Sequence, residues 1–525
     1  MEISVGEHNY TPENIALLIA TNTQLTKENL QLKANLEATE KRLSLLVEQV
    51  KLNKHRRFSQ QNEKSKYLDL QLELAFDEEG TEETNLDEEI KAKELAVDAD
   101  TETITYSRRK KTVGRRIDTS KLPREIVIHD LPEAEKCCDK CGNQLEKFGE
   151  DRSEQLEYIP AQVKVIEHIC PKYSCRSCEI VKAGTKPEMP IAKSMAAPSL
   201  IAEVIVKKFE CHLPWYRQSK IFTQDGLDIP ANTIGNWFME AGEVLEPLCL
   251  ALKAEINCTN SLQADETPVK VLKDNHRGYM WGYHSLKPDN RFVLFEYNGT
   301  RSGKVASDSL RSYRGILQTD GYGGYNNLRA RNDIISIGCW AHCRRHFTDV
   351  IKIASSSGKA HEIVKWIGKL YRIEEVAREQ NLSFAMRKEL RQAQAPPILQ
   401  KIHELLTKSI PPPKSVLGKA IAYALNNWEY LIKYIDHGEA EIDTNLIENQ
   451  IRPFAISRKN WLFLGNERAA KTAAFFYSLI QTCRLNNINP KKYLIYILYQ
   501  ASQMRRKEVE PNSILPQFID RTLLA

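Results

Sequence analysis

The sequence predicts a multidomain α/β protein, in which a mixed sheet flanked by helices is joined to a coiled coil, a zinc module and further helical regions. Three observations favour this class: leucines at heptad spacing near the N-terminus, two Cys-x-x-Cys pairs, and five short strand-like runs in the second half. At about 150 residues per domain, 525 residues suggest three or four domains. A hydrophobic content of 42% excludes a chain that is disordered throughout.

The N-terminal segment carries a coiled-coil pattern. Alternating steps of three and four residues connect Ile15, Leu18, Asn22, Leu25, Asn29, Leu32, Leu36, Thr39, Leu43, Leu46 and Val50. The pattern lasts five heptads without Gly or Pro, which favours a coiled coil. Asn22 and Asn29 would pair best with their copies across a parallel two-stranded seam, so we expect a homodimer. The alternative is a long helix packed inside the monomer.

Charge is distributed in blocks, although the net charge of +5 from 74 bases and 69 acids says little about partners. The segment Asp77–Glu102 holds twelve acids against two lysines and is expected to be a solvated linker. Six cations follow within nine residues: Arg108, Arg109, Lys110, Lys111, Arg115 and Arg116. Such a block fits a solvated tail as well as a nucleic-acid contact.

Membrane insertion and secretion are not expected. No apolar run approaches the 18 or so residues that a membrane span needs. Residues Met1–Tyr10 include two acids and lack the basic start of a secretory signal. The sequence therefore predicts a cytoplasmic protein, in which disulfides are rare and cysteines more often bind metal.

Two Cys-x-x-Cys pairs predict a structural zinc site. Cys138 and Cys141 form the first pair, and Cys175 and Cys178 form the second. Four thiolates supply the tetrahedral set that zinc prefers, so a zinc-ribbon-like module is expected. Cys137 and Cys170 are rival ligands that the spacing leaves open.

Residues 197–252 show three helical patterns, and the turn between two of them fits a helix-turn-helix or an ordinary helical linker. Short runs rich in Val, Tyr, Trp and Phe then predict strands, with a helix at Lys304–Tyr313 between the third and fourth. These strands are Leu262–Leu272, Tyr279–Ser285, Phe292–Tyr297, Gly315–Thr319 and Ile334–Gly338. A meander followed by strand–helix alternation indicates a mixed sheet. Helical sequence follows from Phe347 to about His437, where Pro396-Pro397 and Pro411-Pro412-Pro413 are expected to interrupt it.

Three acids are candidates for a divalent-metal site. Asp265 and Asp320 each end a short apolar run, and Glu448 lies in a helical pattern. Acids at strand ends can converge at one sheet edge, where carboxylates would hold two Mg²⁺ (or Mn²⁺) ions for phosphoryl transfer. Taken singly, each acid is better explained as a cap or turn residue.

The segment Cys339-Trp-Ala-His342-Cys343-Arg-Arg-His346 has Cys and His at helical spacing. Four ligands from one helix would converge poorly on a metal, so a packed strand-to-helix junction is favoured over a metal site. Arg344 and Arg345 would then face phosphate or solvent.

Several motifs together resemble the DDE transposases of the bacterial insertion-sequence family numbered sixty-six, over nearly the whole chain. They are the two cysteine pairs with Tyr173-Ser-Cys175-Arg-Ser-Cys178, His212-Leu-Pro-Trp-Tyr-Arg217, Ala264-Asp265-Glu-Thr-Pro268, Thr319-Asp320-Gly-Tyr322, Gly338-Cys-Trp-Ala-His342 and Ile451-Arg-Pro-Phe-Ala-Ile-Ser-Arg-Lys-Asn-Trp-Leu-Phe463. The resemblance implies an RNase H-like catalytic domain with the metal-binding triad Asp265, Asp320 and Glu448, interrupted by an all-α insertion. The chain departs from the family's usual Asp-Asn-Asn before the glutamate, since it has Asp443-Thr444-Asn445. It also has Phe58-Ser-Gln-Gln-Asn-Glu63 where the family usually shows Phe-Gly-Arg and then Ser-Glu.

The resemblance implies a transposase that binds terminal inverted repeats and cuts and joins DNA strands through two Mg²⁺ ions, in a bacterial, nucleoid-associated setting. Phosphate contacts are expected from the 108–116 cations and from Arg217, Arg452, Arg458 and Lys459. The expected parts are a coiled coil (1–60), linker (61–125), zinc module (126–190), helical DNA-binding region (191–257), catalytic core (258–346 and 441–505), helical insertion (347–440) and tail (506–525).

Partners would be DNA, a second protomer in a synaptic complex, and accessory proteins of the same element. The alternative readings are a non-catalytic, zinc-containing DNA-binding regulator and a nuclease that does not join strands.

Overall fold

The computed structural model describes residues 12–58, 163–175, 180–185, 188–192, 194–273, 276–353 and 358–524. The chain divides into two compact units, one of residues 79–186 and one that combines 1–78 with 187–525. The predicted zinc ligands Cys138, Cys141 and Cys178 and the cations of 108–116 lie outside the described residues. In the smaller unit, strands β1 (Lys172–Cys175) and β2 (Ile180–Ala183) pair antiparallel, and β1 ends at Cys175, the first cysteine of the second pair.

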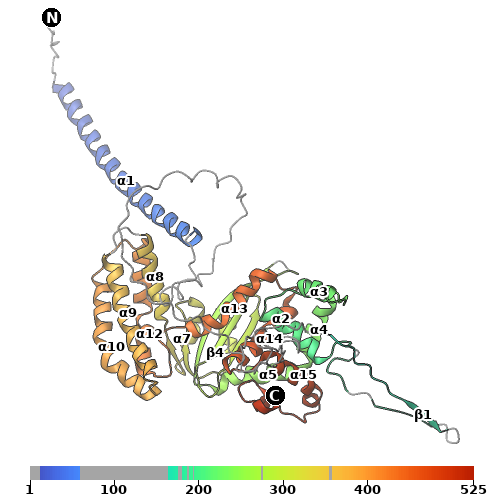
Figure 1. Cartoon of the computed structure of the whole chain (residues 1–525). Helices are drawn as coiled ribbons and strands as arrows, with labels where there is room; N and C mark the ends of the chain where they lie inside the picture. Colours follow the sequence, from blue (N-terminus) through green and yellow to red (C-terminus); the bar gives the residue numbers. More distant parts are fainter. Residues whose placement is uncertain are drawn as a thin grey trace, which may run out of the picture. The chain divides into compact units, whose positions relative to one another are not determined.

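The N-terminal segment forms one helix of 47 residues, α1 (Pro12–Phe58) (Figure 1). Five leucines of the heptad pattern are between 52% and 64% exposed on it, namely Leu25, Leu32, Leu36, Leu43 and Leu46. A long helix with an exposed leucine stripe is what the predicted coiled coil requires of each protomer. Pairing of two such helices stays a prediction.

The larger unit is built on a five-stranded mixed sheet in the order β5-β4-β3-β6-β7. Strands β3 (Ser261–Val271), β4 (His276–Ser285) and β5 (Val293–Asn298) form an antiparallel meander. Strands β6 (Gly315–Gln318) and β7 (Ile334–Ile337) are parallel to β3. Helix α6 (Gly303–Ser309) precedes β6 in the chain, and η3 (Gly323–Tyr325) and α7 (Asn326–Arg329) lie between β6 and β7. The predicted mixed sheet with flanking helices is confirmed, and each strand lies within a few residues of its expected position.

Two hydrophobic cores cover the two faces of the sheet. Neighbouring side chains on a strand point to opposite faces, and on β6 Leu317 belongs to one core while Ile316 belongs to the other. Three helices were expected at 197–252, and the structure has four there, α2 (Pro198–Phe209), α3 (Trp215–Gln224), α4 (Ala231–Val244) and α5 (Glu246–Ala254). All four contribute to the Leu317 core, as does the short η2 (Glu255–Cys258) that follows. These helices therefore share a core with the sheet.

The C-terminal part of the chain completes the same core with α13 (Asn445–Trp461), α14 (Glu467–Leu485), α15 (Pro490–Arg505), η5 (Pro511–Ile514) and η6 (Arg521–Leu524). Helix α14 also supplies hydrogen-bond acceptors to the backbone N–H groups of edge strand β5. Thr482 Oγ1 accepts from Val293 N at 3.1 Å, and Ser478 Oγ accepts from Phe295 N at 2.7 Å. A covered edge cannot recruit another strand.

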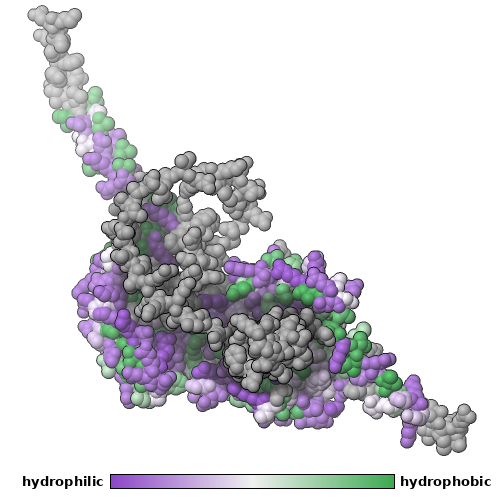
Figure 2. All heavy atoms as spheres, in the orientation of Figure 1, coloured by the Kyte–Doolittle hydropathy of each residue, from purple (hydrophilic) through white to green (hydrophobic). Residues whose placement is uncertain are grey.

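The helical insertion forms the second core with α8 (Trp340–Ile353), α9 (Gly358–Glu379), α10 (Phe384–Thr407), α11 (Val416–Asn426), α12 (Trp428–Ile432) and η4 (Lys433–Asp436). Figure 2 shows hydrophilic residues predominating on the outer face of α9 and α10. The expected interruption at Pro396-Pro397 is wrong, since α10 continues through both prolines. Burial of Ala395, Leu399 and Ile402 in the core offsets the two missing N–H donors. Across the described segments, no helix is long and apolar enough to cross a membrane.

Candidate active site

Strand register places the two candidate aspartates side by side. Gln263 of β3 is the parallel partner of Gln318 of β6, and Asp265 and Asp320 each follow two residues later. Side chains two apart share a face, and neighbouring strands lie about 4.8 Å apart, so both carboxylates lie beside each other on one face of the sheet. The expectation that Asp265 ends its strand is wrong, because β3 continues to Val271, whereas Asp320 does follow the end of β6. Asp265 Oδ1 accepts a hydrogen bond from Glu266 N at 2.8 Å, and Asp320 Oδ1 accepts one from Tyr322 N at 2.9 Å.

The same two glutamines hold the segment that carries the third acid. Gln263 Nε2 donates to Gln318 Oε1 at 3.0 Å and to Asp443 O at 2.8 Å, and Gln263 Oε1 accepts from Ile447 N at 3.0 Å. Gln318 Nε2 donates to Glu441 O at 2.7 Å. Both amides are fully buried, so each contact is worth more than it would be in water. They fix the start of α13 on the aspartate-bearing strands.

Electrostatics connect Asp265 to the other candidate acids. Burial raises the pKa of Asp265 well above its usual range, and the charges of Glu266, Asp320 and Glu448 raise it further. Burial and the charge of Asp320 also raise the pKa of Glu266. Crowded carboxylates favour the protonated form unless a cation joins them.

Glu266 is a fourth carboxylate at this site, and it is held differently. Arg301 Nε donates to Glu266 Oε1 at 2.8 Å, and the Tyr325 hydroxyl donates to Oε2 at 2.7 Å. Both contacts oppose the rise in its pKa. Because both carboxylate oxygens of Glu266 already accept hydrogen bonds from protein side chains, Glu266 is a poorer candidate for a metal ligand.

Glu448 lies among polar side chains from α8. Its Oε2 is 3.5 Å from Arg345 Nη2, its Oε1 is 3.6 Å from His342 Nδ1, and the Thr444 hydroxyl donates to Oε1 at 3.5 Å. Burial lowers the pKa of His342 to about 4, so its imidazole is neutral at pH 7 and Arg345 supplies the charge. Arg345 thus contacts Glu448 instead of facing open solvent, and its side chain is 15% exposed because α8 runs beside the start of α13; the expected phosphate contact stays a prediction.

The candidate donor set fits a hard divalent cation, since it consists of carboxylate oxygens, and a bound metal would lower the raised pKa of Asp265. Within the described ranges, however, no group of three or more His, Cys, Asp or Glu side chains is arranged so that it could hold a metal ion. Each triad acid already has a polar partner of its own, and Glu448 is turned toward Arg345 and His342.

Cys339 belongs to the junction between β7 and α8. Its sulfur accepts hydrogen bonds from the backbone N–H and the hydroxyl of Thr444 at 3.3 and 3.2 Å. Burial raises the pKa of the Cys339 thiol to about 12, which disfavours the thiolate that binds metal. This arrangement agrees with the predicted packed junction. Thr444, which departs from the family pattern, thus contacts both Cys339 and Glu448.

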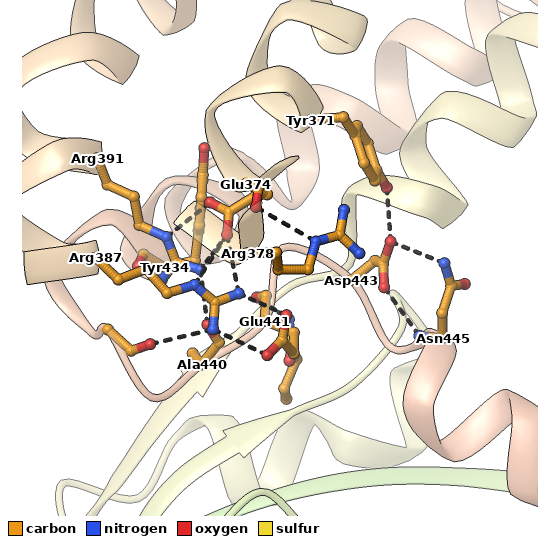
Figure 3. Close-up of polar contacts among 12 residues, drawn as sticks. Tyr371, Glu374, Arg378, Arg387, Arg391, Tyr434, Ala440, Glu441, Asp443 and Asn445 are labelled. Atoms are coloured by element: carbon orange, nitrogen blue, oxygen red, sulfur yellow. Dashed lines mark hydrogen bonds and ion pairs between the residues drawn. The ribbon is translucent and has the colours of Figure 1, made fainter. Parts of the chain in front are cut away.

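A buried ionic network connects the helical insertion to the segment before Glu448 (Figure 3). Arg391 donates to both oxygens of Glu374 at 2.7 and 2.8 Å, and Arg387 bridges Glu374 to Glu441. The Tyr371 hydroxyl donates to Asp443 Oδ2 at 2.9 Å, while Asp443 Oδ1 accepts from the backbone N–H of Asn445 at 3.1 Å. Helices α9 and α10 therefore fix both ends of the segment that enters α13.

The predicted phosphate contacts within the described chain differ in accessibility. Arg217 and Lys459 are exposed, whereas Arg452 and Arg458 are partly buried. Arg458 donates to Thr267 Oγ1 at 3.1 Å and to Pro268 O, so it joins α13 to β3.

Comparison with known proteins identifies the family. The model described as "Transposase IS66 family" matches residues 193–472, which is more than half of the chain and contains all three acids. The chain belongs to the IS66 family of transposases. Further matches are the "zinc-finger binding domain of transposase IS66" at 135–179 and "Transposase C of IS166 homeodomain" at 45–127. The IS66 zinc-finger match spans all four predicted zinc ligands.

Similar proteins come from Sinorhizobium fredii (strain NBRC 101917 / NGR234). "Uncharacterized protein y4jD" is 33% identical over 72% of this chain and 76% of its own length. "Uncharacterized protein y4hP" is 31% identical over 86% of this chain and 85% of its own length.

Sequence reasoning missed the residues that hold the triad in place. Gln263 and Gln318 left a signal, because each is a polar residue in an apolar run, two positions before an aspartate. Glu266 and Arg345 left no comparable signal, since their roles depend on which distant segments they meet.

Proposed function

We propose that this IS66-family chain is an active DDE transposase, which binds the terminal inverted repeats of its element and catalyses DNA strand cleavage and strand transfer. Asp265, Asp320 and Glu448 would be the catalytic metal ligands. The observation that carries this proposal is the register of β3 and β6, which aligns the two aspartates while Gln263 and Gln318 hold the glutamate helix against them.

Two Mg²⁺ or Mn²⁺ ions, when bound, would activate the attacking oxygen and stabilise the leaving oxygen of an in-line phosphoryl transfer. The residues of the chain contribute position and electrostatics. Asp265 and Asp320 offer oxygens from adjacent strands, and the crowding that raises the pKa of Asp265 favours cation binding. Glu448 is presented from the start of α13, with Arg345 and His342 beside it.

DNA recognition would use the parts of the chain around this core. Cys138, Cys141, Cys175 and Cys178 would hold a structural Zn²⁺ in the module that the IS66 zinc-finger model matches. The cations of 108–116, with Arg217, Arg452, Arg458 and Lys459, would neutralise phosphates. The exposed leucine stripe of α1 would pair two protomers, so that two DNA ends are held together.

We propose the same domain boundaries that the sequence predicts, and we add that one region belongs to the catalytic unit. Helices α2 to α5 share a core with the sheet, so the region 191–257 would present DNA contacts from the surface of the catalytic unit. The protein would act on DNA in the bacterial cytoplasm, and accessory proteins of the same element are candidate partners.

End cleavage in vitro tests the proposal. Purified protein is incubated with a labelled duplex that carries the element's terminal repeat and with Mg²⁺ or Mn²⁺. Asp265→Asn, Asp320→Asn and Glu448→Gln should each abolish nicking while repeat binding persists, whereas the exposed control Glu429→Gln should behave as wild type. Retained cleavage in any triad variant would remove that residue from the metal site.

The same assay separates the alternatives. A DNA-binding regulator would bind the repeat without divalent metal and would never nick it. A nuclease would nick the repeat but would not join the liberated 3′ end to a second duplex.

A further inference from the structure

The turn that follows α13 has an unusual backbone. Leu462 adopts a left-handed conformation, with φ 61° and ψ −43°, and Phe463 N donates to Trp461 O at 2.7 Å. This hydrogen bond spans two residues, so Trp461–Phe463 is a γ-turn with positive φ, a rare and strained geometry. Glycine or asparagine would adopt it at lower cost than leucine does.

Two of the three side chains of this γ-turn do not offset the strain by packing. Leu462 is 66% exposed and Phe463 is 39% exposed, so both present apolar surface to solvent. Their chain neighbours Trp461 and Leu464 are buried, at 6% and 4% exposure. Strained backbone residues cluster at functional sites, so this γ-turn motivates a functional hypothesis.

The backbone on both sides of the γ-turn is fixed to the sheet. Leu464 N donates to Lys270 O at 2.9 Å, and Leu272 N donates to Leu464 O at 2.8 Å. Lys273 N donates to Gly465 O at 3.1 Å. The γ-turn is therefore held at the far end of β3, where it presents two apolar side chains from a rigid base.

Cations surround this base. Lys270 and Lys273 bond to the chain after the γ-turn, Arg277 faces Lys270 across the β3–β4 ladder, and Lys459 is exposed on the last turn of α13. Burial and the nearby charge of Arg277 lower the pKa of Arg458 to about 10. Positive charge thus accumulates around an exposed apolar tip.

Lys208 adds a buried cation on the other side of Trp461. Its ammonium lies 5.4 Å from the Trp461 ring and 4.3 Å from the Trp215 ring, and burial lowers its pKa to about 8. Exposed Tyr216 and Arg217 follow Trp215 on α3. Figure 2 shows apolar and hydrophilic residues interspersed over the region of α3 and α13.

We propose that the γ-turn Trp461–Phe463 is a DNA-contacting element, whose Leu462 and Phe463 side chains enter a groove of the bound DNA end while the surrounding cations hold its phosphates. This inference rests on the proposed function. Apolar side chains such as Leu and Phe insert between base steps in proteins that bend DNA, and cations position the duplex beside them. A protein partner would instead need a broad apolar patch with few charges at its centre.

The fold also sets where this contact would fall. Fourteen residues separate Glu448 from Leu462, and at 1.5 Å per helical residue they span roughly 20 Å along α13. At about 3.4 Å per base pair, this span corresponds to roughly six base pairs from the scissile phosphate for a duplex that follows the helix.

The test uses two substitutions that the backbone tolerates. Leu462→Gly and Leu462→Asn both suit the positive φ, so the thermal midpoint should stay unchanged or rise. Full-length protein in the Asp265→Asn background is titrated with a terminal-repeat duplex that carries 2-aminopurine near the sixth base pair. We expect binding to weaken about tenfold, as for loss of one buried leucine contact, together with loss of the fluorescence rise that reports unstacking.

Ile410→Asn is the matched control, because Ile410 is 94% exposed on the insertion, and it should change neither signal. Wild-type affinity and an unchanged 2-aminopurine signal in both Leu462 variants would overturn the inference. Failure of the proposed catalysis is a separate outcome. In that case the wild-type protein would not nick DNA, but the Leu462 variants would still bind the repeat more weakly than the wild type.

Discussion

The substitution Arg391→Met tests how the insertion supports the site. Arg391 is fully buried in α10, and Met fills similar volume without a charge. The arginine donates to both oxygens of Glu374 and to three backbone carbonyls of the segment before α13, those of Tyr434, His437 and Ala440, at 2.7 to 2.9 Å. Its removal therefore affects five hydrogen bonds at once.

The expected cost follows from what is left behind. Glu374 keeps its contact with Arg387, at 3.0 Å, so it is not stranded as an unpaired charge. The three carbonyls lose this donor, and an unsatisfied buried acceptor costs about 1–3 kcal/mol. Such costs are not additive, and loss of one partner from a buried ion pair typically lowers the free energy of unfolding by about 3–5 kcal/mol. We expect a value in that range.

Urea unfolding of the full chain measures this loss, and amide hydrogen exchange over 434–448 shows whether the segment entering α13 opens. Gln392→Ala is the neighbouring control, because Gln392 makes an exposed contact to Asp436 and should cost less than about 1 kcal/mol. A loss below about 1 kcal/mol for Arg391→Met, with unchanged exchange, would refute the argument that this network fixes the segment.

The network also predicts a pH dependence. Burial alone would raise the pKa of Glu374, but the hydrogen bonds and charges of Arg391 and Arg387 outweigh it, and the net pKa is lowered. The stabilisation is thus present above the unfolded pKa of about 4.3 and is lost as pH falls through the lower folded pKa. In Glu374→Gln, unfolding experiments between pH 5 and pH 2 should lack this contribution to the acid-side slope.

Three further variants probe the site itself. Mn²⁺ at a hundredfold above Kd should raise the free energy of unfolding of the wild-type protein by about 2.7 kcal/mol in thermal-shift experiments, and should not stabilise Asp265→Asn. The Mn²⁺ affinity of the wild type should rise with pH as Asp265 loses its proton. Tyr371→Phe should cost about 1–2 kcal/mol in urea unfolding, and the deficit should grow as pH rises through 6, because the lost hydrogen bond lowers the pKa of buried Asp443, now about 6. Gln263→Leu leaves the Gln318 side-chain oxygen, Asp443 O and Ile447 N without their partner, so it should cost about 3 kcal/mol and reduce end cleavage at saturating metal.

Short-range pattern was enough to predict the sheet. Each strand contains β-branched or aromatic residues and is flanked by turn residues, and such signals depend on neighbouring residues alone. The same runs placed Asp320 correctly after its strand, whereas β3 continues for six residues beyond Asp265 to Val271. Their alignment also required the parallel register of β3 and β6, which the motif resemblance implied and the strand runs alone did not.

Long-range pairing explains what the sequence did not reveal. The partner of Arg345 is Glu448, 103 residues away, and Gln263 meets Asp443 across 180 residues. No local period encodes such contacts. The error at Pro396-Pro397 has the same origin, because the propensity of two prolines to end a helix was outweighed by the burial of Ala395 and Leu399 against the rest of the insertion.

A long insertion does not prevent Glu448 from being positioned near the two aspartates. Asp320 and Glu448 are 128 residues apart (448 − 320), yet the entropic cost of closing a loop grows only with the logarithm of its length. The insertion folds around its own core, so little of that length remains free. What then determines the position of the glutamate is the exit from the insertion, where Arg387 holds Glu441, Tyr371 holds Asp443 and Gln263 holds Ile447 N. Substitutions at this exit should therefore affect Glu448 more than equally destabilising substitutions elsewhere in the insertion.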